Sequence, residues 1–117
     1  MNYTPYIQKL RECRAQEKAL AENSRQQALA AAREIAAVLK RDFLAQRVIL
    51  FGSVLSPEHF HLRSDIDMAT LGVPPKQFFK ASGCVIDLAK PFNIDLINLK
   101  DCRPALSEKI VTRGMEL

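Results

Sequence analysis

The chain has 117 residues, 48% of them hydrophobic and 26% charged, which suits one globular domain and excludes a disordered chain. Its formal charge of +4 is compatible with a phosphate-bearing ligand or an acidic partner, but there is no polybasic run, so we expect no direct binding of nucleic acid. Three cysteines without CxxC spacing, no signal peptide and no bilayer-length apolar run predict a cytoplasmic protein without disulfides, structural zinc or membrane segment.

Residues 5–45 predict a long helix, because they contain no glycine, no proline after Pro5, and many strong helix formers. Thr4 and Pro5 supply an N-cap and a first helical residue. Glu17 and Ser24 interrupt the apolar stripe, so a kink or a break within residues 21–26 stays open. We assign residues 1–32 to an N-terminal helical extension and residues 33–117 to the main domain. The polar first half of the helix either contacts a partner or a second copy, or covers the far side of the core.

The remainder of the chain alternates between short strands and helices. Strands are expected at 48–51, 65–71 and 92–99, and helices at 75–90 and 102–113, with Gly114 as the final stop signal. A loop covers residues 54–64 and a turn covers residues 72–75. This order predicts an α/β fold: a small mixed sheet of three or four strands, with helices against one face and a long N-terminal helix before it.

Acidic residues mark the candidate site. Asp65 and Asp67 are separated by one residue in an expected strand, so both carboxylates point to the same face, where they repel each other. The stability of the fold does not explain two repelling carboxylates on one face, whereas a divalent cation bound between them would. If the strand that carries Asp95 lies beside them, the three carboxylates converge into a site of hard oxygen ligands suited to magnesium. Gly52 and Ser53 follow an apolar strand, and their amides can donate to phosphate oxygens.

Four segments together carry a resemblance to a known family: VILFGS, FHLRSDIDMA, FNIDLINL and the closing LSEKIVTRGMEL. They resemble the nucleotidyltransferase superfamily with the polymerase-beta-like palm, and in particular the minimal nucleotidyltransferases, or MNT proteins. The resemblance covers roughly residues 33–117. It implies that Gly52 and Ser53 hold the nucleotide phosphates and that Asp65 and Asp67 bind two magnesium ions. It also implies that Asp95 is the third carboxylate, as metal ligand or general base.

Ser64 precedes the first aspartate of this motif, where it either forms a turn or contacts a phosphate. Such family members often neutralise a HEPN-domain toxin by moving AMP from ATP onto a toxin tyrosine, which makes them antitoxins. This chain lacks the Ala-Arg-Gly that commonly follows the motif serine, since residues 52–60 read GSVLSPEHF. A catalytically weak or inactive module that neutralises its partner by contact is therefore the alternative. Transfer to a small molecule is a third hypothesis, against which stands the absence of a second domain for the acceptor.

Overall fold

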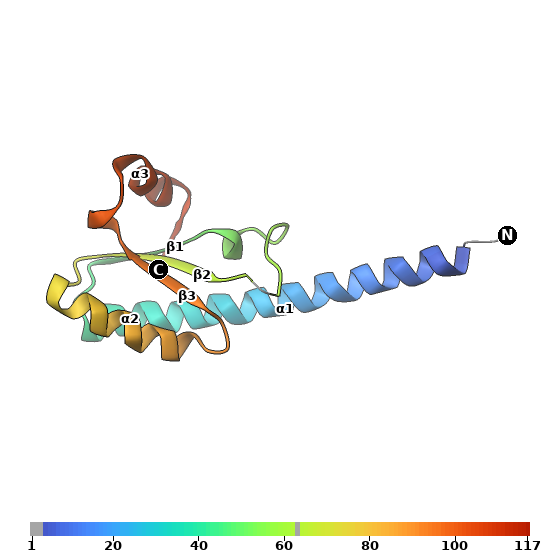
Figure 1. The fold of residues 1–117 in the computed structure, drawn as a ribbon, viewed down its shortest axis with the longest axis horizontal. Helices are drawn as coiled ribbons and strands as arrows, with labels where there is room; N and C mark the ends of the chain where they lie inside the picture. Colours follow the sequence, from blue (N-terminus) through green and yellow to red (C-terminus); the bar gives the residue numbers. More distant parts are fainter. Residues whose placement is uncertain (1–3, 63) are drawn as a thin grey trace.

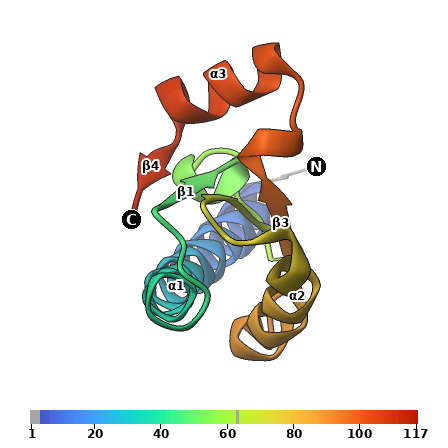
Figure 2. The same ribbon diagram turned by 90° about the vertical axis from the view of Figure 1, so that its left-hand side faces the viewer.

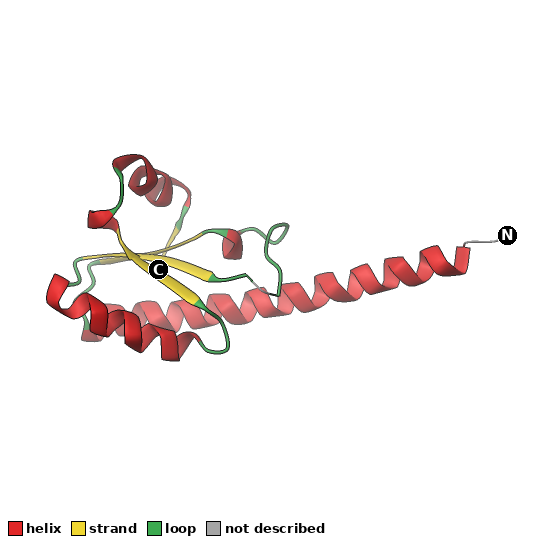
Figure 3. Cartoon of the chain, viewed as in Figure 1, coloured by secondary structure: helices red, strands yellow, loops and turns green. Residues whose placement is uncertain are grey.

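The computed structural model describes residues 4–62 and 64–117, and it confirms the expected α/β class (Figure 3). Every helix in these ranges is too short or too polar to cross a membrane. The elements follow in the order α1 Thr4–Asp42, β1 Arg47–Phe51, the 3₁₀ turn η1 Ser53–Leu55, β2 Ile66–Leu71, α2 Pro75–Ala89, β3 Ile94–Asn98, the 3₁₀ turn η2 Leu99–Asp101, α3 Pro104–Arg113 and β4 Met115–Glu116. The short β4 is the fourth strand of the sheet.

Helix α1 runs for 39 residues without interruption, so the break left open at residues 21–26 does not occur. Residues 4–20 are all exposed, and Figure 1 shows this half of the helix projecting away from the body of the molecule. The second half packs on the core, where Ala28, Leu29 and Ala32 are buried. The expected division at residue 32 falls inside this continuous helix, several residues after its packing begins.

The sheet has four strands in the order β3-β2-β1-β4. Strand β1 is antiparallel to β2 and to β4, whereas β2 and β3 are parallel and are connected through α2. A parallel pair needs such a crossover, because its strands cannot be joined by a tight turn. The register places Phe51 opposite Asp67 and Asp67 opposite Asp95.

Helices cover both faces of the sheet, which corrects the expectation that they lie on one (Figure 2). Val48, Leu50 and Met68 belong to the core shared with α1 and α2. On the opposite face, Ile49 and Ala69 form a second cluster with Ile110 of α3. We call these the α1–α2 face and the α3 face. The physical reason lies in β1, whose three central residues are all apolar, so each side of the strand needs cover.

Candidate functional site

The site is built around the residue that ends β1. Gly52 has φ +85° and ψ −159°, a backbone conformation that is essentially restricted to glycine. A Cβ atom at this position would lie 2.4 Å from Oδ2 of Asp67. The turn after β1 therefore brings bare backbone directly against the carboxylate of β2, and a side chain at residue 52 would prevent this approach.

Asp67 and Asp95 are paired positions of the parallel strands β2 and β3, so their side chains point to the same face. Asp67 is also opposite Phe51, which packs in the α3-face cluster, and this places both carboxylates on that face. Asp65 is exposed and lies one residue before β2. The structure thus brings Asp67 and Asp95 together as predicted and leaves Asp65 at the start of the strand.

Negative charge accumulates around Asp67. Burial raises the pKa of the Asp67 carboxyl above its usual range, and the charges of Asp95 and then Asp65 raise it further. Both effects oppose ionisation, because burial removes hydration and like charges repel. A cation bound beside Asp67 would relieve this repulsion.

The carboxylates Asp65, Asp67 and Asp95 have the donor chemistry of magnesium ligands. Carboxylate oxygens are the ligands that magnesium prefers, usually with several waters and substrate oxygens completing its coordination. Among residues 4–62 and 64–117, no three His, Cys, Asp or Glu side chains form a group that could hold a metal ion by themselves. The donor type and the charge fit magnesium, and the assignment of Asp65, Asp67 and Asp95 as its ligands stays a prediction.

Helix α1 fixes the turn that follows Gly52. The Arg25 guanidinium donates to the carbonyl oxygen of Val54 in η1 at 3.1 Å, and to both carboxylate oxygens of Glu22 at 2.9 Å. The hydrogen bonds that Glu22 accepts from Arg25 and from Gln26 lower the pKa of its carboxyl from 4.5 to about 2. The backbone around Ser53 is thereby tied to the packed half of α1.

The loop before β2 is held by its own side chains. The Oγ of Ser64 accepts the amide of His61 at 3.0 Å, and the Ser56 hydroxyl is hydrogen bonded to Nδ1 of His59 at 2.7 Å. Ser64 therefore forms a turn, which is one of the two roles expected for it. Its contact with a nucleotide, like the phosphate contacts of Gly52 and Ser53, stays a prediction.

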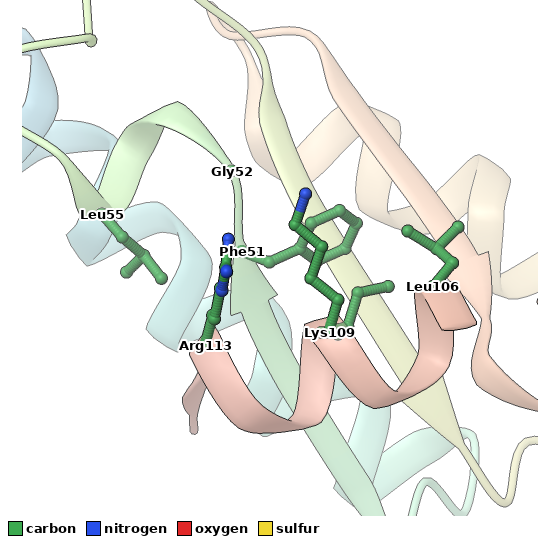
Figure 4. A pocket seen from close by; sticks show the side chains of 7 residues that line it. Phe51, Gly52, Leu55, Leu106, Lys109 and Arg113 are labelled. Atoms are coloured by element: carbon green, nitrogen blue, oxygen red, sulfur yellow. The ribbon is translucent and has the colours of Figure 1, made fainter. Parts of the chain in front are cut away.

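A cavity of about 390 Å³ opens beside Gly52, between the end of β1 and α3 (Figure 4). Lys109 and Arg113 extend from α3 toward the turn at Gly52. Sequence reasoning placed this helix but did not identify its two cations as site residues. The available signal was their spacing of four, which puts them on one side of a helix. The cavity is lined by Phe51, Gly52, Leu55, Leu106, Lys109, Ile110 and Arg113.

The fold is that of a small nucleotidyltransferase palm. No family model and no curated protein matches the sequence. A solved structure described as a minimal nucleotidyltransferase is similar with a TM-score of 0.66 and 20% identity, over 80% of this chain and 95% of that one. A toxin–antitoxin structure with AMP-PNP is similar with a TM-score of 0.57 and 27% identity, over 71% and 69%.

A third similar structure is a tri-AMPylated HEPN toxin of Shewanella oneidensis in complex with its MNT antitoxin. Its TM-score is 0.56 and its identity 22%, over 76% of this chain and 70% of that one. The resemblance to the minimal nucleotidyltransferases is confirmed, and the fold of this chain is theirs.

Proposed function

We propose that this chain is a magnesium-dependent nucleotidyltransferase that moves AMP from ATP to a tyrosine hydroxyl of a HEPN-domain toxin, and thereby acts as its antitoxin. The observation that carries the proposal is Asp67, paired with Asp95 and packed against Gly52 in a minimal nucleotidyltransferase fold. The similar structures that contain AMP-PNP or an AMPylated HEPN toxin support this choice of donor and acceptor. Free thiols at Cys13, Cys84 and Cys102 are compatible with a cytoplasmic location.

Each residue has a defined task in this reaction. Gly52 and Ser53 would direct backbone amides at the phosphates, and Asp65 and Asp67 would hold the magnesium ions, with Asp95 as third ligand or as base. Bound magnesium supplies Lewis acidity and stabilises the charge that develops on the phosphate oxygens. The tyrosine oxygen bonds to the α-phosphorus while the bond to pyrophosphate breaks, and the hydroxyl proton passes to Asp95 in its role as base.

Transfer of label tests the proposal. Lysate of the source organism, in which the partner's presence has been verified, is incubated with the purified chain, magnesium and ATP labelled at the α-phosphate. We expect a labelled protein band with the wild type and none with Asp67→Asn. Asp87→Asn is the matched control, because Asp87 is an exposed aspartate of α2, and it should label normally. ATP labelled at the γ-phosphate should give no band that depends on the chain, which separates nucleotidyl transfer from phosphorylation.

Neutralisation by contact is the second candidate, and the exposed half of α1 favours it. Tyr6, Ile7 and Leu10 are exposed and lie on one side of the helix. Leu10 lies eighteen residues, about five helical turns, before the buried Ala28, so this apolar side continues the one that packs on the core. Asp67→Asn would then still protect cells from the toxin.

Pairing of two copies through this exposed half of α1 also stays a prediction. Light scattering of the purified chain is the measurement that tests it.

A further inference from the structure

The cavity beside Gly52 has a chemical character of its own, and the following inference rests on the proposed function. One part of its lining is apolar, with Phe51, Leu55 and Leu106, and the other part carries Lys109 and Arg113. Both charged side chains extend toward the Gly52 turn (Figure 4). A hollow with apolar walls and two converging cations is suited to a ligand that combines an uncharged portion with strong negative charge.

The two cations have no ion-pair partner within the described part of the chain. The ion pairs found there use Arg25, Arg41, Arg47 and Lys90 instead. Lys109 and Arg113 are therefore available to pair with the negative charge of a ligand. An arginine guanidinium can bind two phosphate oxygens at once, and a lysine ammonium adds a compact positive charge beside it.

Gly52 connects this cavity to the carboxylates. It lines the cavity and also lies against Asp67, so the carboxylates and the two cations border the same turn. Both also belong to one side of the sheet, since α3 covers the face to which Asp67 and Asp95 point. A nucleoside triphosphate whose α-phosphate lies at the carboxylates would have its β- and γ-phosphates within reach of Lys109 and Arg113.

We propose that Lys109 and Arg113 bind the β- and γ-phosphates of the nucleoside triphosphate and hold the pyrophosphate as it leaves. When the bond between the α-phosphorus and its bridging oxygen breaks, negative charge grows on that oxygen and passes to pyrophosphate. Two cations at this position stabilise the growing charge. The same pair distinguishes a triphosphate from a monophosphate, because only the triphosphate has groups that reach it.

Nucleotide binding to the purified chain tests this assignment without any acceptor. The dissociation constants of ATP and AMP are measured by calorimetry with magnesium, for the wild type and for Lys109→Ala/Arg113→Ala. Losing two charge-assisted hydrogen bonds should weaken ATP binding by about tenfold or more. AMP binding should be unchanged. Lys76→Ala/Lys80→Ala is the matched control, since it removes the same charge from exposed positions of α2 and should leave ATP binding unchanged.

The outcomes separate this inference from the proposed function. Wild-type affinity for ATP in the Lys109→Ala/Arg113→Ala variant overturns the inference, while label transfer by the wild type would keep the function. Equal weakening of ATP and AMP also overturns it, because the cations would then not act on the outer phosphates. A wild type that binds no ATP overturns both. Because Lys109 and Arg113 are both exposed, we expect the double variant to fold. An unchanged melting temperature verifies this.

Discussion

Gly52 and Asp67 are in such close contact that the β1 turn and the carboxylate of β2 fix each other's position. The space between them has no room for a methyl group, since a Cβ at residue 52 would lie 2.4 Å from Oδ2 of Asp67. The same residue has a backbone conformation that other amino acids rarely adopt. The glycine of the Gly-Ser motif is thus required here by geometry, whatever ligand the site binds.

Replacing Gly52 by alanine should destabilise the fold and displace Asp67. Strain in this backbone region costs about 1–3 kcal/mol, and the overlap with the carboxylate adds to it. We expect a lower urea midpoint and, if Asp67 holds magnesium, loss of label transfer. Gly83→Ala is the control, because Gly83 lies within α2 and a Cβ there meets nothing within 4 Å. It should raise the free energy of unfolding by about 0.5–1 kcal/mol. An unchanged midpoint in Gly52→Ala would contradict this account.

Asp67→Asn should separate stability from activity. The substitution removes the repulsion between two neighbouring carboxylates on adjacent strands, and such repulsion destabilises the fold. Without magnesium, we therefore expect the variant to unfold at a slightly higher temperature than the wild type, although it transfers no label. A lower melting temperature would indicate that the Asp67 carboxylate is stabilised in the fold by a favourable contact.

The contact of Glu22 with Arg25 predicts a dependence of stability on pH. Because the folded-state pKa of Glu22 is about 2 and its usual value is 4.5, the ionised carboxylate favours folding at a pH above 4.5. This contribution should be lost as the pH falls from 4.5 to about 2. The melting temperatures of the wild type and Glu22→Gln are compared across this range. Their difference should be present at neutral pH and shrink toward pH 2, and a constant difference would refute the assignment.

Removing residues 1–20 should leave the core intact. Residues 4–20 are exposed along their whole length, and the first fully buried residue of α1 is Ala28. We expect the calorimetric melting temperature of the shortened chain to change little, with a loss of helical circular dichroism in proportion to the residues removed. By contrast, Ala28→Asp should lower the melting temperature strongly, because it buries an unpaired charge. A large effect of the deletion would show that the projecting half has a partner, such as a second copy.

Local patterns were sufficient for much of this structure. The apolar run ending at Phe51, the spacing of Asp65 and Asp67 and the alternation around Asp95 predicted three strands. They also predicted that the three carboxylates converge, and the structure pairs two of them, Asp67 and Asp95, while Asp65 lies one residue before β2. The position of α3 could not be predicted in this way, because a strand that is apolar on both faces does not reveal which helix covers which face. For the same reason, Lys109 and Arg113 could be placed on one helix but not beside Gly52.

The continuity of α1 was underestimated for a different physical reason. Glu17 would break an apolar stripe only where that stripe is buried, and here it is surrounded by solvent. Arg25, nearly five turns before the helix ends at Asp42, is partly buried and bonds to Glu22 and to the carbonyl of Val54, so it does not interrupt the packing. Polar residues in a helical pattern therefore marked the limit of the core, not the end of the helix.

The projecting half of α1 depends on the packed half of the same helix for its helical structure. Residues 4–20 extend over roughly 25 Å at 1.5 Å per residue, and a free helix of this length is only marginally stable in water. The packed turns from Ala28 onward supply the helix nucleus from which the helix extends through residues 4–20. Amide hydrogen exchange should accordingly be slow near Ala28 and become faster toward Thr4. A partner that binds the N-terminal end of α1 would slow exchange there, although it would remain far from the carboxylates.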